Sequence, residues 1–501
     1  MHAGKIRYAV SFLAGAASVL AFSPFDFYPL ALLGVALLFG LWLNRSAREM
    51  AWLGYFYGLG KMLLGVFWLH VSIAQFGGVT LPLAMLAAVL FAACMALFFA
   101  LAGWLAGWLQ QRLATPETLT LLLLLPAVWV LMEWLRAHFF TGFPWLSLGY
   151  SQIDAPLAGV APVLGVFGVS WLVALTAGLL VLLTRPTLTA GRRYVLLALL
   201  VVGWLAAHFA TAIQWTSPLG QPLSVRVVQG NIAQQIKWHP SQLAPTLQLY
   251  TGLSFEQPAD LIIWPETAVP AFASDVEQRL LQPLHQRLRQ QQSELLTGLV
   301  TRAADQGYYN SVITLGGPRS QYDKRHLVPF GEFAPLDFLL RPLVDYFRIP
   351  MSNFRRGTAA QPLVSLKGMP VGVSICYEDA FGDEVIEALP DAAYLINVSN
   401  DAWFGDSLAP YQHLQIARMR SLETGRYLIR STNTGISALV NPQGEIEAQT
   451  ALQQQAVLSG QVQPRQGATP YVRWGDGLII ALALLSLLSA GLLARRSRDS
   501  V

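Results

Sequence analysis

The stretch Val371-Gly-Val-Ser-Ile-Cys376-Tyr-Glu378-Asp379 decides the fold of the polar half of the chain. Its first five residues are mostly apolar and β-branched, and such a run predicts a buried strand. The strand leads directly into the cysteine and then into a stretch with helical character. We expect this strand-to-helix turn to expose the cysteine, and we expect backbone N–H groups at the helix start to favour its thiolate.

Two further stretches end in ionisable residues. One is Leu261-Ile-Ile-Trp-Pro-Glu266, an apolar strand that stops at a carboxylate, with a proline ending the ladder pairing just before it. The other is Tyr322-Asp-Lys324-Arg-His-Leu-Val-Pro-Phe-Gly-Glu332, which supplies a lysine and a second carboxylate. Three segments of the polar half therefore deliver a thiol, an amine and carboxylates.

These groups are suited to covalent catalysis by a cysteine. A free thiol has a pKa of about 8.5, so at neutral pH it needs a base and a positive neighbour. Glu266 can take the thiol proton, and Lys324 can stabilise both the thiolate and a tetrahedral oxyanion. Glu332 and Glu378 are expected to orient the lysine or the base. Taken alone, Cys376 is more typical of a core residue, and Lys324 is more typical of a solvent-exposed surface residue. The combination of these residues with Glu266 indicates an active site.

Two histidines, His326 and His413, leave a Cys–His arrangement open, although no local pattern assigns either of them as the base. No spacing of histidines, cysteines or carboxylates is typical of a metal site, and no Gly-rich phosphate loop follows a strand. The sequence therefore predicts neither a metal nor a cofactor.

Composition places the rest of the chain in a membrane. Of the 501 residues, 54% are hydrophobic and 12% are charged, and the mean hydropathy is +0.45. Soluble domains have about 25% charged residues. The net charge of +4 is spread over short loops and predicts no nucleic-acid partner. The two cysteines, Cys94 and Cys376, lie in an apolar run and in the polar half, so we expect no disulfide.

About eight segments are apolar over roughly the 20 residues that cross a hydrocarbon core. They are Tyr8–Phe22, Tyr28–Leu43, Ala51–His70, Leu81–Leu109, Leu119–Leu135, Ala158–Leu183, Val195–Ile213 and Leu478–Leu493. The first segment has a basic start like that of a signal peptide, but it lacks a clear small-residue cleavage site and further spans follow at once. We interpret it as a helix.

Basic residues in the short connections predict the orientation, because they mark the cytoplasmic side. One set of connections holds Lys5, Arg7, Arg45, Arg48, Arg112, Arg185, Arg192, Arg193, Arg495, Arg496 and Arg498, and the alternate set holds only Arg136. We therefore expect both termini in the cytoplasm. The predicted domains are helices one to seven in residues 1–215, an extracytoplasmic domain in 216–473, and helix eight with a cytoplasmic tail in 474–501.

The segment 216–473 alternates short strands with helical stretches, a pattern typical of one α/β domain. The predicted strands are 224–228, 261–264, 294–297, 311–315, 371–375, 394–398, 427–431 and 436–440. Helices are expected at Val276–Gln292 and His413–Gly425. The turn Asn441-Pro-Gln-Gly between two apolar runs predicts a hairpin.

The motifs Trp264-Pro-Glu266, Tyr322 to Glu332 and Ile375-Cys376-Tyr-Glu378 resemble those of the nitrilase, or carbon–nitrogen hydrolase, superfamily. In that superfamily they contribute base, lysine and nucleophile on an αββα sandwich. A nitrilase-like domain before the last of about eight membrane helices resembles the apolipoprotein N-acyltransferases. Further similar segments are Val228-Gln-Gly-Asn231, Lys237-Trp238 and Asn397-Val-Ser-Asn-Asp-Ala-Trp403-Phe-Gly405.

This resemblance implies a reaction. An acyl chain moves from a phospholipid, expected to be phosphatidylethanolamine, to Cys376 as a thioester. The α-amine of a diacylglyceryl-cysteine at the start of an apolipoprotein then takes the chain in a ping-pong scheme, the last step of bacterial lipoprotein maturation. The resemblance also implies the bacterial inner membrane, with a periplasmic catalytic domain, and we expect a monomer.

Other residues are candidates for lipid contact. Residues 334–354 mix apolar and charged side chains at helical spacing, so Leu339 and Leu340 belong either to an interfacial arm that guides acyl chains or to a segment packed into the domain. Trp238 and Trp403 line the lipid entrance in one interpretation and are core or belt aromatics in the other. Tyr377 is expected to shape the pocket beside the cysteine.

Two other functions stay open. The first is a membrane-tethered amidase or nitrilase in which water resolves the thioester, although one anchor helix would suffice for it. The second is a lipid-binding or transport protein with an inactive enzyme domain, which need not keep Glu266, Lys324 and Cys376. Within the apolar segments, Lys61 and Glu133 are costly if they face lipid, and a structural pairing or a position at a helix interface is expected for them.

Overall fold

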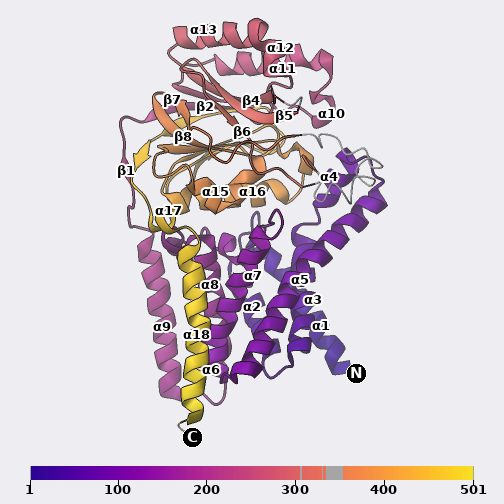
Figure 1. The fold of residues 1–501 in the computed structure, drawn as a ribbon, viewed down its shortest axis with the longest axis vertical. Coiled ribbons are helices and arrows are strands. Elements are labelled where there is room, and N and C mark those ends of the chain that lie inside the picture. The colour runs from indigo at the N-terminus through magenta and orange to yellow at the C-terminus, as the bar shows by residue number, and fades with distance from the viewer. Residues whose placement is uncertain (1, 305–306, 330, 334–353, 500–501) are drawn as a thin grey trace. The chain divides into compact units, whose positions relative to one another are not determined.

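The structure, a computed structural model, describes residues 2–304, 307–329, 331–333 and 354–499 (Figure 1). The chain forms two compact units. One comprises Met1–His70, Pro82–Ile213 and Arg473–Val501, and the other comprises Val71–Leu81 and Gln214–Val472. We call them the helical unit and the α/β unit.

The helical unit consists of helices that coincide with the predicted apolar segments. These are α1 (His2–Ala17), α2 (Pro29–Trp42), α3 (Ala47–Gly65), α5 (Leu81–Leu113), α6 (Glu117–Leu119), α7 (Leu125–His138), α8 (Ala161–Leu183), α9 (Ala190–Ala210) and α18 (Gly477–Asp499). Short helical turns precede or continue several of them. The multi-pass helical class is thus confirmed.

The predicted number of membrane spans, about eight, is higher than the number of helices that are long and apolar enough to cross a membrane. Among the described residues, five helices are long and apolar enough to cross a membrane, or six if the bent pair α3 and α4 (Leu69–Phe76) is one span. The difference lies at the N-terminus, because α1 has 16 residues and α2 has 14. A straight span needs about 20 residues.

Glycines allow α1 and α3 to lie in backbone contact. A Cβ atom on Gly15 would lie 1.9 Å from the carbonyl oxygen of Tyr57, and one on Gly60 would lie 2.1 Å from that of Phe12. No larger residue fits at either position. Small residues that permit such close approach are the usual basis of helix association in membranes.

The two intramembrane charges of the sequence lie inside the helical unit. Lys61 is fully buried with its ammonium 5.0 Å from the ring of Phe22. Glu133 is 3% exposed, and its Oε1 accepts hydrogen bonds from Trp129 Nε1 and from Leu148 N, both at 3.0 Å. These contacts favour the structural role for Glu133 over a lipid-facing one.

The α/β unit contains two six-stranded sheets. The first has the order β13 (Ala456–Val462), β2 (Leu223–Gln229), β3 (Leu261–Ile263), β4 (Glu294–Arg302), β5 (Tyr308–Leu315) and β6 (Gln321–Asp323). The second has the order β12 (Ile446–Gln449), β11 (Ala438–Val440), β10 (Leu428–Thr432), β9 (Tyr394–Ser399), β8 (Met369–Ile375) and β7 (Val364–Leu366). In each sheet three strands are parallel, β2-β3-β4 and β8-β9-β10, and antiparallel strands flank them. A small ladder pairs β1 (Ser217–Pro218) with β14 (Arg465–Gln466).

Helices cover the outer face of each sheet (Figure 1). Those on the first sheet are α11 (Pro240–Ser254), α12 (Ala273–Val276) and α13 (Gln282–Gln290), and those on the second are α15 (Gly382–Ile386) and α16 (Ala409–Thr424). Between the sheets lies a core to which Ile263 contributes from the first and Ile375 from the second. Separate cores hold Leu288 under the first sheet and Leu414 under the second. The expected αββα sandwich is confirmed.

The predicted strands are all present, and β11 and β12 form the predicted hairpin. The sequence did not indicate the short strands β6 and β7, the edge strand β13 or helix α11. Residues 334–353, including Leu339 and Leu340, lie outside the described residues.

Candidate active site

Glu266 follows β3 in a turn that lies flat on β4. The turn can come this close because β4 has Gly298 at the contact: a Cβ there would lie 2.4 Å from Thr267 N and 2.7 Å from the Glu266 Cα. Hydrogen bonds from Val269 N to Gly298 O and from Gly298 N to Pro265 O fix the turn. The Glu266 side chain is thereby buried in the α/β unit with 7% exposure.

Lys324 follows β6 and is almost fully buried. Its backbone N–H donates to the carbonyl of Asn310 on β5 at 2.8 Å. Its Nζ lies 2.8 Å from Glu332 Oε2 and 3.8 Å from Glu266 Oε1. The predicted base, the lysine and the second carboxylate are therefore brought together.

Asn310 joins the two carboxylates, and sequence reasoning missed it. Its Nδ2 donates to Glu266 Oε1 at 2.6 Å and to Glu332 Oε1 at 3.2 Å. The available signal was a primary amide at the start of the apolar run Asn310-Ser-Val-Ile-Thr-Leu315. A buried amide in a strand needs partners, which makes it a candidate for a polar site.

Cys376 lies at the end of β8 and begins the short turn of 3-10 helix η6 (Cys376–Ala380). Its φ of 54° is unusual for a residue with a side chain, so the surroundings must hold this backbone conformation. The residue is 8% exposed, so the expectation of an exposed cysteine is wrong. The thiol lies within electrostatic range of Glu266 and Lys324.

The expected thiolate is also not favoured at rest. Burial raises the pKa of the Cys376 thiol, the charge of Glu266 raises it further, and the charge of Lys324 opposes both. A five-residue turn supplies too little helix dipole to reverse the desolvation. The resting sulfur is therefore protonated, and its activation requires a base.

Glu266 and Lys324 have pKa values suited to such activation. Burial raises the pKa of Glu266, and the charge of Lys324 offsets only part of this rise. The Glu266 carboxylate is therefore a stronger base than an exposed one. Burial alone would lower the pKa of Lys324, but Glu332 and Glu266 outweigh burial and raise it. Glu266 Oε2 has no hydrogen-bond partner among the described residues and is available to take a proton.

Glu378 joins the cysteine turn to the lysine stretch. Its carboxylate accepts hydrogen bonds from the backbone N–H groups of Ile375 at 2.7 Å, Arg325 at 2.6 Å and His326 at 3.0 Å. The Tyr322 hydroxyl donates to it as well, at 3.1 Å. We expected this carboxylate to orient the lysine or the base. Its hydrogen bonds instead position the backbone on both sides of the site.

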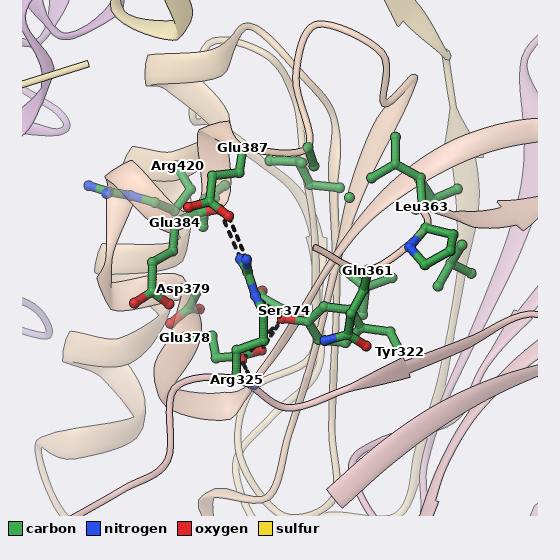
Figure 2. A pocket seen from close by; sticks show the side chains of 18 of the residues that line it. Tyr322, Arg325, Gln361, Leu363, Ser374, Glu378, Asp379, Glu384, Glu387 and Arg420 are labelled. Carbon is green, nitrogen blue, oxygen red and sulfur yellow. Dashed lines mark hydrogen bonds and ion pairs between the residues drawn. The ribbon is translucent and has the colours of Figure 1, made fainter. Parts of the chain in front are cut away.

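A cavity of about 200 Å³ lies beside this turn, and Figure 2 shows its wall. Glu378, Arg325 and Glu387 belong to the lining, and the Arg325 guanidinium pairs with Glu387 at 2.5 Å across it. The lining includes neither Glu266 nor Cys376. We therefore place the candidate chemistry at the buried carboxylate–lysine–cysteine cluster and not in this cavity.

Trp238 follows a second buried lysine whose role the sequence did not indicate. Lys237 is in α10 (Gln234–Lys237), and its Nζ donates to the Glu266 carbonyl at 3.2 Å and to Thr267 Oγ1 at 2.7 Å. Burial lowers the pKa of Lys237 to about 8. Trp238 is 40% exposed, so it is not a core residue.

Trp403 and Tyr377 contact other aromatic rings. Trp403, in the turn η7 (Asp401–Phe404), packs edge-on against Phe76 at 4.7 Å between ring centroids. Tyr377 packs edge-on against Phe381 at 5.1 Å. The ring of His326 stacks on Phe381, and its Nδ1 lies 2.7 Å from Glu384 Oε1, so His326 is engaged away from the thiol.

The other histidine of the open Cys–His arrangement is equally engaged. His413 lies on α16, with Nδ1 3.0 Å from Asp401 and Nε2 2.9 Å from Asp379. Its contact with Cys376 is to the backbone carbonyl, at 3.3 Å. The geometry therefore favours Glu266 as the base.

Two known protein families match separate parts of the chain. The carbon–nitrogen hydrolase family matches residues 224–471, and the apolipoprotein N-acyltransferase N-terminal domain matches residues 14–179. The chain is thus a membrane protein with a carbon–nitrogen hydrolase domain. A carbon–nitrogen hydrolase structure from Helicobacter pylori is 16% identical, with a TM-score of 0.37 over 48% of this chain and 89% of that one.

Curated relatives match over nearly the whole length. The apolipoprotein N-acyltransferase of Methylococcus capsulatus is 45% identical over 92% of this chain and 91% of the relative. That of Nitrosomonas europaea is 43% identical over 99% of both chains. The chain belongs to the apolipoprotein N-acyltransferase family.

Proposed function

We propose that this protein transfers an acyl chain from a phospholipid, through a thioester on Cys376, to the N-terminal α-amine of a diacylglyceryl-cysteine on an apolipoprotein. The observation that carries the proposal is the buried pairing of Lys324 with Glu266 and Glu332, in which Lys324 and Glu266 act electrostatically on the Cys376 thiol. Family membership supports the class of reaction. Glu266 is the general base and acid, Lys324 the oxyanion stabiliser, and Cys376 the nucleophile.

In the first half-reaction Glu266 removes the thiol proton as sulfur attacks the ester carbonyl of the phospholipid. The carbonyl oxygen becomes an oxyanion, and the ammonium of Lys324 stabilises it. The carbon–oxygen bond to the glycerol then breaks, and Glu266 returns the proton to the departing alkoxide. The products are the acyl thioester and a lysophospholipid.

In the second half-reaction the α-amine of the lipoprotein attacks the thioester. Glu266 takes the proton that the nitrogen loses, and Lys324 again stabilises the oxyanion. The carbon–sulfur bond breaks, and the thiolate recovers the proton from Glu266. One cysteine used by two lipid substrates in turn gives ping-pong kinetics.

The proposed topology follows from the basic residues in the short connections between the apolar segments, which mark the cytoplasmic side. Residues 1–215 form the N-terminal membrane domain, 216–473 form a periplasmic catalytic domain, and 474–501 form the last helix and a cytoplasmic tail of an inner-membrane monomer. The proposed donor is phosphatidylethanolamine. Trp238 and Trp403 are proposed to line its entrance, and the exposure of Trp238 supports this role.

Leu339 and Leu340 are proposed to lie in an interfacial arm that guides acyl chains to Cys376. Replacing both by serine should impair turnover of phospholipid in vesicles while leaving the Tm of the protein unchanged. Normal turnover of vesicle lipid by the double variant would rule the arm out.

The decisive experiment mixes the purified protein with phosphatidylethanolamine and measures its intact mass, with Cys376→Ala as the control. We expect a hydroxylamine-labile acyl adduct on the wild type alone, discharged by a synthetic diacylated lipopeptide. Hydrolysis of small amides with no adduct from any phospholipid would instead assign the tethered amidase.

A further inference from the structure

Four buried charges lie directly behind the cysteine turn. They are Asp379 on η6, Asp401 on η7, His413 on α16 and Arg430 on β10, and each is at most 1% exposed. Arg430 lies 3.1 Å from a carboxylate oxygen of each aspartate. His413 lies 2.9 Å from Asp379 and 3.0 Å from Asp401. We call these four residues the buried charge cluster.

The geometry requires a doubly protonated His413. Its Nδ1 lies against Asp401 Oδ1, and its Nε2 lies against Asp379 Oδ1 and the carbonyl oxygen of Cys376. All three partners are acceptors, so both ring nitrogens must carry a proton. Burial and Arg430 lower the pKa of His413, but the two aspartates outweigh them and raise it to about 9. The cluster therefore holds two positive and two negative charges.

The cluster reaches the nucleophile along its backbone. The carbonyl oxygen of Cys376 accepts from His413 Nε2 and from Asn397 Nδ2, each at 3.3 Å. Asn397 is itself fixed by Arg430, whose Nη1 lies 2.5 Å from its Oδ1. These contacts hold the carbonyl of a residue whose φ is positive.

The cluster also reaches the sulfur. The Ser399 hydroxyl donates to Asp401 Oδ1 at 3.0 Å. Beside burial, which raises the pKa of the Cys376 thiol most, Asp401 raises it and Ser399 lowers it. The cluster therefore acts on both the carbonyl and the thiol of Cys376.

We propose that the buried charge cluster is the positioning device of the nucleophile, and that His413, as an imidazolium, keeps the Cys376 backbone in the conformation that aims its thiol at Glu266 and Lys324. This inference rests on the proposed function, since it takes Cys376 to be the nucleophile. His413 neither touches substrate nor transfers the reacting proton. It acts through the residue it holds.

The charge balance of the cluster distinguishes this role from simple packing. His413→Gln keeps a hydrogen-bonding side chain but leaves the cluster with a net charge of −1, whereas His413→Gln with Asp379→Asn restores neutrality. Uncompensated buried charge is strongly unfavourable, and residues of one network are not additive. The double variant should therefore be better than His413→Gln, although it carries one substitution more.

The test measures transfer from phosphatidylethanolamine to a diacylated lipopeptide and, separately, the rate at which iodoacetamide alkylates Cys376. All proteins carry Cys94→Ala so that only Cys376 is alkylated, and activity is counted per mole of folded protein, measured by circular dichroism. We expect His413→Gln to lower kcat about 100-fold with little change in KM, and to slow alkylation. The double variant should recover about 10-fold of the lost kcat. His285→Gln on α13, whose Nδ1 accepts from Gly316 N, is the matched control and should behave as wild type.

A kcat for His413→Gln within about twofold of wild type would overturn the proposal, as would a double variant worse than the single one. Failure of the proposed function gives a different result, because either the wild type would form no acyl adduct or Cys376→Ala would still transfer acyl chains. If Cys376→Ala is inactive while His413→Gln is fully active, only the positioning role is wrong.

Discussion

The side-chain amide of Asn310 donates a hydrogen bond of 2.6 Å to Glu266, the proposed base. It occupies the Oε1 atom of that carboxylate and leaves Oε2 without a partner among the described residues. One oxygen is therefore held while the other is available for a proton. We therefore expect Oε2 to be the oxygen that takes the thiol proton.

Replacing Asn310 by leucine should release Glu266 and lower kcat for acyl transfer by about 10- to 100-fold, because the base loses its orientation. The measurement is single-turnover formation of the acyl-enzyme. Gln321→Ala on the adjacent strand β6 is the control and should retain normal rates. An Asn310→Leu protein that acylates at the wild-type rate would contradict this role.

Lys324→Met should abolish acyl-enzyme formation and also destabilise the α/β unit. The substitution leaves Glu332 and Glu266 buried without their cation, and removing one partner of a buried pair costs about 3–5 kcal/mol. Adding Glu332→Gln should restore much of the Tm but none of the activity. Equal recovery of both would mean that the lysine is structural and that Cys376 does not require it.

Glu378 and Glu387 form a matched pair, since both contact Arg325 but differ in burial. Glu378 is 2% exposed and binds backbone N–H groups, whereas the side chain of Glu387 is 58% exposed. Glu378→Gln should lower kcat about 100-fold and stability by about 2 kcal/mol, because an amide cannot accept all of these bonds. Glu387→Gln should change either quantity little. Similar losses of kcat and stability in the two variants would contradict the prediction that Glu378, and not Glu387, holds the site in place.

His413 should make stability depend on alkaline pH. Its folded pKa is about 9 against an ordinary 6.5, so the charged form is favoured in the folded state. That stabilisation, on the order of 3 kcal/mol, is complete below pH 6.5 and is lost as the pH rises through about 9. Thermal unfolding from pH 6 to 10 should show a Tm advantage of the wild type over His413→Gln that shrinks with pH. A constant difference would contradict the prediction.

The sequence predicted the sandwich and four residues of the site because each of them ends a segment with a clear period or motif. Glu266 and Cys376 follow apolar strands, Lys324 lies in a recognisable motif, and Glu332 closes the lysine stretch. Asn310 could not be assigned in this way, since its partner Glu266 is 44 residues away and only the sheet brings them together. The position of the side chains in space had to come from the structure.

One other expectation failed for a physical reason, and the count of about eight spans was not fully confirmed. The cysteine was expected to be exposed and ionised, but burial between two sheets outweighs a five-residue turn. The helices were counted from apolar composition, but α1 and α2 are shorter than a straight span. The exposure of the cysteine was inferred from a local pattern, but it depends on packing between strands that are distant in sequence.

The protonated, buried state of Cys376 has a consequence for the lifetime of the enzyme. Thiolates, not thiols, attack peroxides and disulfides and are thereby oxidised, and an oxidised cysteine is rescued most readily by a neighbouring resolving thiol. The only other cysteine, Cys94, lies on α5 in the helical unit. The α/β unit therefore contains no second cysteine that could resolve an oxidised Cys376. The sulfur is protected instead by burial, which raises the pKa of the thiol and disfavours the reactive thiolate.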